Sequence, residues 1–214
     1  MIDVYDDVLE DHSAIAINDA INKLTWRYYY PSEKSKPNMH WHVLCGHNKE
    51  ECEKNGYHWA HTLFDVYMNK FDFKKRYNID GYERIYCNAH THGLEPHIHK
   101  DDGDFTMIYY PRMDWRTEWG GATSIFKELV NATSSPNHEK EYKNIEVDAN
   151  VNYRGNRLVV FDAYLPHQAQ PVSIECYELR PCVVFKCNIS GGNRERLDFY
   201  KNAINEGKVK VRFE

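Results

Sequence analysis

The run NRLVVF, residues Asn156–Phe161, is short, apolar and bounded by Gly155 and Asp162. An apolar run of this kind between turn residues is typical of a buried strand. From Tyr82 onward the sequence repeats the pattern, with runs rich in Ile, Val, Tyr, Phe and Thr separated by Gly, Pro and Asn. The pattern predicts eight strands, at residues 83–88, 97–101, 104–110, 121–126, 145–147, 156–161, 168–173 and 179–188.

Two helices are predicted before these strands. Apolar residues recur every three or four positions over residues 11–26, and every four positions over residues 59–71, so each set lies on one face of a helix. The two sets are Ala14, Ile17, Ile21 and Leu24, and Trp59, Leu63, Tyr67 and Phe71. We interpret the polar segment 31–57 as loop and expect one more helix at residues 193–204.

The order of these elements predicts the fold class. Two helices followed by strands, with no helical pattern between the strands, indicate a mainly β protein with flanking helices. The expected architecture is a double-stranded β-helix (jelly-roll) barrel buttressed by N-terminal helices. We expect a single domain over residues 1–214, with a helical support region at 1–80, the jelly-roll core at 81–190 and a C-terminal tail at 191–214.

Composition excludes some classes of partner. The formal net charge is -5 and the only basic cluster is the short Lys74–Arg76, which argues against a nucleic-acid-binding protein. No run approaches the ~20 apolar residues of a membrane span, and the N-terminus is acidic, so we expect no membrane partner and a cytoplasmic location. The six cysteines are scattered and are interpreted as reduced thiols.

The densest chemical signal is Pro96–Asp102, PHIHKDD. His99 and Asp101 are two residues apart in an expected strand, so their side chains share one face. His167, which follows a later strand, offers a third ligand. Two imidazoles and one carboxylate form the facial triad that holds Fe(II) and leaves positions open for substrate and dioxygen. These three residues are our candidate metal ligands and catalytic residues, with His97 as a rival ligand on the same face.

Several further segments follow this pair in a characteristic order. They are Thr106–Tyr110, Trp119–Thr123, Gly155–Asp162, His167 with Pro171 and Val172, and Arg180–Lys186. Together with His99–Asp101, their order resembles the Fe(II)/2-oxoglutarate-dependent dioxygenase superfamily, in particular its prolyl 4-hydroxylase-like branch. The resemblance covers about the last 110 residues before the tail, and a matching order is far more specific than any single motif.

The resemblance implies a set of cosubstrate-binding residues. Arg180 would pair with the distal carboxylate of 2-oxoglutarate, since a guanidinium can hold a carboxylate with two parallel hydrogen bonds. Lys186 is the rival anchor on the same strand. Tyr110 would donate its hydroxyl to the same carboxylate, and Tyr86 and Asn88 would line the pocket.

The resemblance also implies an activity, the hydroxylation of a substrate C–H bond while 2-oxoglutarate and dioxygen give succinate and CO₂. The implied cofactor is Fe(II), with ascorbate as a reductant. Our first hypothesis is a peptidyl-proline hydroxylase whose partner is a proline-containing protein or peptide, with Trp115, Trp119 and the loop 89–95 as walls of the substrate groove. The alternatives are a free amino acid or another small metabolite as substrate, or a non-catalytic jelly-roll binding module. Resemblance to compact oxygenases of bacteriophages implies a bacterial or phage-infected host cell.

A second cluster of potential ligands lies between the predicted helices. Imidazole and thiolate groups favour zinc, but the spacings here match no standard zinc module. The residues are His40, His42, Cys45, His47, Cys52, His58 and His61. A structural zinc site therefore stays open as the less favoured interpretation.

Overall fold

The computed structural model describes residues 1–31, 39–127 and 145–191. Its helices are α1 (Asp11–Asn22), α2 (Lys49–Lys54), α3 (His58–Phe71) and α4 (Phe73–Tyr77), with a 3-10 turn, η1 (Thr117–Trp119). Its strands are β1 (Ile2–Tyr5), β2 (Arg27–Pro31), β3 (Met39–Gly46), β4 (Ile79–His90), β5 (Phe105–Tyr110), β6 (Thr123–Phe126), β7 (Val147–Val151), β8 (Arg157–Asp162), β9 (His167–Ala169) and β10 (Arg180–Ile189).

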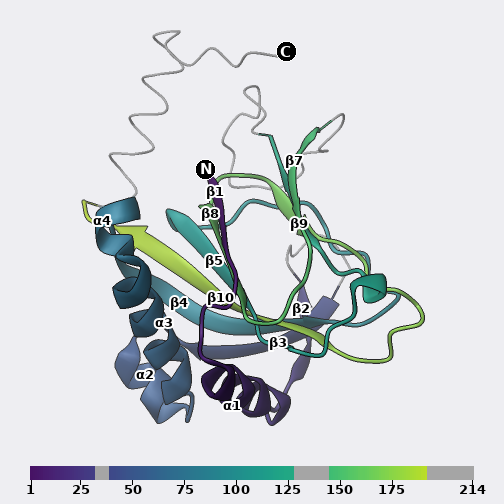
Figure 1. Cartoon of the computed structure of the whole chain (residues 1–214), viewed down its shortest axis with the longest axis horizontal. Helices are drawn as coiled ribbons and strands as arrows, with labels where there is room; N and C mark the ends of the chain where they lie inside the picture. The colour runs from purple at the N-terminus through teal and green to yellow at the C-terminus, as the bar shows by residue number, and fades with distance from the viewer. Residues whose placement is uncertain (32–38, 128–144, 192–214) are drawn as a thin grey trace, which may run out of the picture.

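The strands form two antiparallel sheets (Figure 1). The large sheet has the order β1-β8-β5-β10-β4-β3-β2, and the small sheet has the order β7-β6-β9. The predicted mainly β, jelly-roll fold with flanking helices is confirmed. Pro181 lies where β10 is paired with β4 alone, because pairing with β5 begins at Val183. A proline is tolerated in this central strand because one side of the strand is unpaired there.

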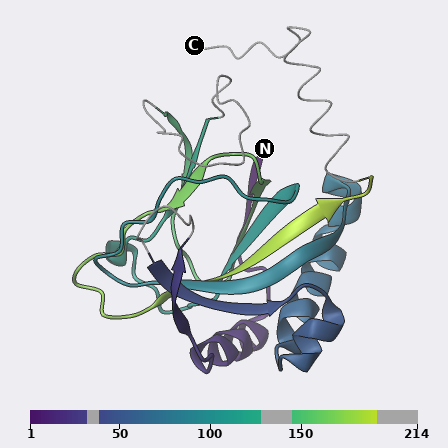
Figure 2. The same ribbon diagram turned by 180° about the vertical axis from the view of Figure 1, so that it is seen from behind.

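Alternate residues of β10 belong to two different cores. Val183 and Phe185 pack with Leu63 of α3 in the core under the helices, whereas Cys182 and Val184 belong to the core between the two sheets. Figure 2 shows the helices on the outer side of the large sheet. By the same alternation, positions 180 and 186 of β10 face the inner side of the large sheet, where the small sheet lies.

Both predicted helices are present. Helix α1 begins at Asp11 as expected but ends at Asn22, before the chain enters β2 at Arg27. Helix α3 spans His58–Phe71, which agrees with the predicted 59–71. Among the residues that the structure describes, no helix has the length and apolar character needed to cross a membrane.

From the sequence, residues 31–57 are interpreted as loop. This is wrong for residues 39–57, which the structure describes and which contain β3 and α2. The alternating pattern of β3 is hard to recognise because the positions facing the inner side carry His40 and His42, which look like solvent-facing residues in a sequence. Helix α2 is a single short helix, capped by Asn48, whose side chain accepts from the Glu51 amide at 2.9 Å. The region 1–80 therefore holds strands β1–β3 as well as helices.

The strand predicted at residues 97–101 is also wrong. The structure has only an isolated bridge between His99 and His167 there, with two backbone hydrogen bonds of 2.9 and 3.0 Å. Pro96 has no amide hydrogen to donate to a longer ladder. The seven other predicted strands each overlap an observed strand, with shifted ends. The helix predicted at 193–204 lies outside the described residues.

Candidate metal centre

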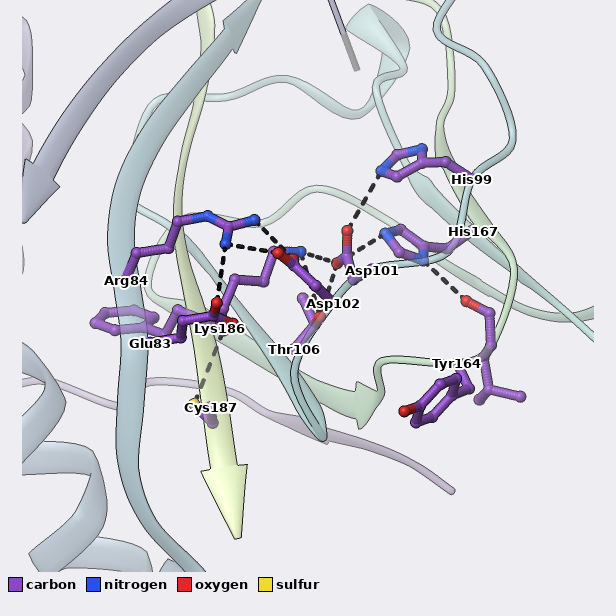
Figure 3. Close-up of polar contacts among 12 residues, drawn as sticks. Glu83, Arg84, His99, Asp101, Asp102, Thr106, Tyr164, His167, Lys186 and Cys187 are labelled. Atoms are coloured by element: carbon purple, nitrogen blue, oxygen red, sulfur yellow. Dashed lines mark hydrogen bonds and ion pairs between the residues drawn. The ribbon is translucent and has the colours of Figure 1, made fainter. Parts of the chain in front are cut away.

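His99, Asp101 and His167 converge on one point between the sheets (Figure 3). Each offers one ligand atom, and the three atoms lie within 4.8 Å of one another. Nε2 of His99 is 3.6 Å from Oδ1 of Asp101, and Nε2 of His167 is 3.2 Å from Oδ2. Over residues 1–31, 39–127 and 145–191 this is the only such group of histidine, cysteine and acidic side chains. The described part of the cluster at 40–61 thus forms no comparable zinc site.

Backbone contacts hold the two segments that carry these residues. The bridge between His99 and His167 joins them directly, and the Asp101 amide donates to the Ala163 carbonyl at 2.9 Å. The two imidazole rings lie 4.4 Å apart, and Phe161 packs against His167 with ring centroids 4.8 Å apart. The fold therefore fixes the three side chains without a regular strand at residues 97–101.

Hydrogen bonds to the backbone determine which imidazole nitrogen is free. Nδ1 of His99 lies 2.9 Å from the His97 carbonyl, and Nδ1 of His167 lies 2.9 Å from the Leu165 carbonyl. A carbonyl can only accept, so each Nδ1 carries the hydrogen and each Nε2 presents a lone pair. Burial, together with the neighbouring His167, lowers the pKa of His99 to about 4, so this imidazole is neutral at pH 7.

The consequence is a cluster of three acceptors that face one another. Two Nε2 lone pairs and a carboxylate have no hydrogen between them, and they repel unless a cation joins them. A donor set of two neutral imidazole nitrogens and one carboxylate oxygen suits Fe(II) with open positions for other ligands. His97 lies outside the group, and its carbonyl instead orients His99, as outer-shell groups commonly do at metal sites.

Thr106 and Lys186 also contact the Asp101 carboxylate. Its Oδ2 accepts a hydrogen bond from the Thr106 hydroxyl at 2.7 Å and contacts the Lys186 ammonium. Burial acts to raise the pKa of Asp101, but Lys186 and the adjacent imidazoles hold it well below its usual range. The carboxylate is therefore ionised, as a metal ligand must be.

Arg180 lies in the same inner space, with only 1% of the residue exposed. Its guanidinium carbon is 5.4 Å from the ring centre of Tyr110 and 5.3 Å from that of Tyr153. It donates to the Thr123 hydroxyl at 3.2 Å and to the Gly121 carbonyl. Within the described residues, no acidic side chain forms an ion pair with Arg180.

The other three predicted cosubstrate-binding residues lie near different basic side chains. The Tyr110 hydroxyl donates to Thr123 at 2.7 Å, which joins it to the Arg180 cluster. The Tyr86 ring lies 5.7 Å from the Lys186 ammonium, and Asn88 accepts from Nδ1 of His42 at 2.8 Å.

The two predicted tryptophans lie beside the Arg180 cluster. Trp115 packs on Tyr153 with ring centroids 4.7 Å apart, and on Trp119 at 5.1 Å. Its indole nitrogen donates to the Gly120 carbonyl at 3.0 Å. Trp119 also faces the guanidinium of Arg116, 5.1 Å from its ring centre.

Several site residues were not identified from the sequence. Gly121 and Thr123 lie inside Trp119–Thr123, one of the segments that carry the resemblance to the oxygenase superfamily. The sequence therefore pointed to this segment, although not to these two residues. Thr106 likewise opens the segment Thr106–Tyr110 of the resemblance. Tyr153 gave no signal, because it lies between β7 and β8, outside the segments that carry the resemblance. Only the fold brings Tyr153 onto Arg180 and Thr106 onto Asp101.

Comparisons with known proteins agree with this geometry. A family model described as the 2OG-Fe(II) oxygenase superfamily matches residues 78–185. The comparison with curated proteins gives no match. Similar solved structures include a prolyl-4-hydroxylase from Pseudomonas putida, with 12% identity, a TM-score of 0.59, and coverage of 89% of this chain and 93% of that chain.

Two further similar structures contain bound molecules. One is a prolyl hydroxylase from Trichoplax adhaerens in complex with a hypoxia inducible factor peptide fragment, with 16% identity, a TM-score of 0.58, and coverage of 87% of this chain and 83% of that chain. The other is HygX from Streptomyces hygroscopicus with nickel, 2-oxoglutarate and hygromycin B, with 9% identity, a TM-score of 0.59, and coverage of 89% and 83%. Identities this low show a shared fold and leave the substrate open.

Proposed function

This chain belongs to the 2OG-Fe(II) oxygenase superfamily, and we propose that within this superfamily it hydroxylates a proline residue in a peptide or protein. The broader activity, oxygenation that depends on Fe(II) and 2-oxoglutarate, follows from the family. The observation that carries the assignment of the site is the convergence of His99, Asp101 and His167, each with a free acceptor atom, within 4.8 Å.

In this proposal the three side chains hold the iron through the two Nε2 atoms and one carboxylate oxygen. When bound, the iron would let dioxygen act as the oxidant of a C–H bond, and 2-oxoglutarate would supply two of the electrons as it is converted to succinate and CO₂. The protein's own contribution is to fix the ligands, anchor the cosubstrate and hold the target carbon in place. The backbone hydrogen bonds to both Nδ1 atoms orient the imidazoles before any ligand arrives.

Arg180 is the proposed anchor for the distal carboxylate of 2-oxoglutarate. A buried guanidinium without an anionic partner is costly, and a carboxylate would relieve that cost through charge-assisted hydrogen bonds. The hydroxyls of Tyr110 and Thr123 lie beside it and can add further hydrogen bonds. The rival Lys186 is already engaged with Asp101, which favours Arg180.

The proposed proline substrate rests on similarity and on aromatic side chains. Two of the similar structures are prolyl hydroxylases, and one of them holds a peptide. Trp115 and Trp119 form a half-buried aromatic pair, which suits packing against a proline ring. These two residues remain our candidates for the wall of the substrate groove.

A small polar metabolite is the second candidate substrate. The inner face of β3 and β4 carries imidazoles, with the His40 and His90 rings 5.4 Å apart and His42 bonded to Asn88. Burial lowers the pKa of His40 to about 4, so at pH 7 its imidazole is neutral, with one ring nitrogen that carries a hydrogen and one that is an acceptor. Such groups suit a substrate with hydroxyl or amide groups. HygX, of similar fold, has hygromycin B bound.

The test separates the oxygenase activity from the substrate. Purified protein is supplied with Fe(II), ascorbate and 2-oxoglutarate, and succinate is measured with and without dioxygen. Proline-containing peptides, free amino acids and other small metabolites are then examined by mass spectrometry for the gain of one oxygen atom. A gain on a free amino acid or another metabolite with none on any peptide would replace the prolyl proposal, whereas absence of succinate under every condition would overturn the assignment of the site.

A further inference from the structure

Lys186 is a charged side chain in the middle of the large sheet. It lies on β10, opposite Thr106 of β5 and Arg84 of β4, and only 1% of the residue is exposed. Its ammonium contacts Oδ2 of Asp101 and lies 3.5 Å from the Thr106 hydroxyl oxygen (Figure 3). Burying an ammonium is costly unless it is paired, so this contact defines the place of the side chain.

The two oxygens of Asp101 are in different environments. Oδ2 is held by Thr106, which donates at 2.7 Å, and by the Lys186 ammonium. Neither of these contacts involves Oδ1, which is 3.6 Å from Nε2 of His99. Oδ2 also faces the site, because it lies 3.2 Å from Nε2 of His167. Without its two donors, Oδ2 would be within reach of a bound ion.

We propose that Lys186 is a positioning residue which, with Thr106, occupies Oδ2 of Asp101 so that only Oδ1 is offered to the iron. The inference rests on the proposed function, because it assumes that Asp101 is a metal ligand. A carboxylate that chelates through both oxygens would take one coordination position more than a carboxylate bound through one. The open positions of a facial triad are those that the cosubstrate and dioxygen need.

The same contact sets the charge of the site before metal binds. The Lys186 ammonium is then the positive charge nearest to Asp101, and a metal ion must bind beside it. Two cations close to one buried carboxylate repel each other. Removing the ammonium should therefore strengthen metal binding, while it removes a coordination position from the other ligands.

The test uses Lys186→Met, which keeps the length of the side chain and removes its charge. Mn(II) is added to the metal-free protein, and its affinity is measured together with the number of bound waters, from the broadening of the Mn(II) resonance by ¹⁷O-labelled water. The variant is expected to bind Mn(II) at least roughly tenfold more tightly, because a buried like charge is removed, and to show one bound water fewer than the wild type.

A matched control and a second variant keep the result interpretable. Val184→Ala removes a side chain from the same face of β10 and is expected to leave both the water number and the Mn(II) affinity unchanged. Thr106→Val removes the other donor to Oδ2 and is expected to shift the water number in the same direction as Lys186→Met. If Lys186→Met does not fold, Thr106→Val decides the question.

The outcomes distinguish this inference from the proposed function. An unchanged water number in both folded variants overturns the role of Lys186. A wild-type protein that binds no Mn(II), or binds it equally after His167→Ala, overturns the metal site and this inference with it. Tighter binding with one water fewer supports both.

Discussion

Gly121 and Arg180 fit together only because residue 121 has no side chain, since a β-carbon there would lie 2.8 Å from Cδ of Arg180. The backbone of Gly121 also has a φ of +72°, which disfavours other residues. Gly121→Ala should therefore displace the guanidinium. We expect the 2-oxoglutarate concentration for half-maximal succinate formation to rise roughly tenfold, and stability to fall by about 1–3 kcal/mol.

Gly56→Ala is the matched control for this substitution. Gly56 has a φ of +80°, but a β-carbon there would meet nothing within 4 Å. The control should lose stability through backbone strain alone and keep the 2-oxoglutarate requirement of the wild type. Equal requirements in the two variants would contradict the proposed anchoring by Arg180.

Single substitutions of the triad should remove metal binding. We expect His99→Ala, Asp101→Ala and His167→Ala each to abolish succinate formation, because two ligands do not hold Fe(II) in a defined geometry. Mn(II) or Fe(II) binding to each variant is measured by anaerobic titration. The exposed His58 on α3 provides the control, since His58→Ala should keep full activity. Activity retained in any triad variant would count against that residue as a ligand.

The pair between Arg84 and Asp102 should matter little for stability, although its geometry is good. Both hydrogen bonds are 2.6 Å, but the two side chains are 24% and 53% exposed. Exposed pairs contribute about 0–1 kcal/mol. Arg84→Ala should therefore cost less than about 1 kcal/mol in urea unfolding, and the difference should shrink as salt is added. A loss of several kcal/mol would contradict the small contribution expected of an exposed pair.

Removing the Tyr67 hydroxyl should not destabilise the protein. Tyr67 is fully buried, and among the described residues no hydrogen-bond partner reaches its hydroxyl. Tyr67→Phe should leave the free energy of unfolding unchanged or raise it by up to about 1 kcal/mol. Tyr77→Phe is the contrasting variant, because the Tyr77 hydroxyl donates to Asp3 at 2.6 Å, and its loss should cost about 1 kcal/mol. Thermal unfolding of both variants measures the difference.

Stability should fall in mild acid because of His40. Burial lowers its pKa from 6.5 to about 4, so between these values the unfolded chain binds a proton that the folded chain does not. Stability present above pH 6.5 is therefore lost as the pH falls toward 4, by up to about 3 kcal/mol. His40→Gln should flatten this part of the pH profile in urea unfolding. Identical slopes in the two proteins would contradict a neutral buried His40.

Part of the fold could be predicted from the sequence because some strands are apolar on both faces. Strands β5, β8 and β10 lie between two cores, so their apolar runs are continuous and easy to recognise. Strand β3 was missed because His40 and His42 occupy its inner positions. A buried imidazole cannot be told from an exposed one in a single sequence.

The site also has a part that the sequence predicts and a part that only the fold reveals. The pair of His99 and Asp101 follows from a short local spacing, whereas His167 is assigned from its place after a later strand and from the order of the motifs. The surroundings of Arg180 and Lys186 do not follow in this way, because Tyr153 and Asp101 reach them only through the three-dimensional fold. From the sequence, either Arg180 or Lys186 could bind the distal carboxylate of 2-oxoglutarate. The contact between Lys186 and Asp101 favours Arg180 for that role.

The position of β10 has a consequence for biosynthesis. Among the described strands, β10 is the only link between the β1-β8-β5 half and the β4-β3-β2 half of the large sheet, and it is the last of them to leave the ribosome. A nascent chain that stops before Arg180 therefore holds two unjoined half-sheets with exposed edges, which invite aggregation. Assembly of the barrel, placement of the Arg180 guanidinium and pairing of Asp101 with Lys186 therefore all wait for the synthesis of β10.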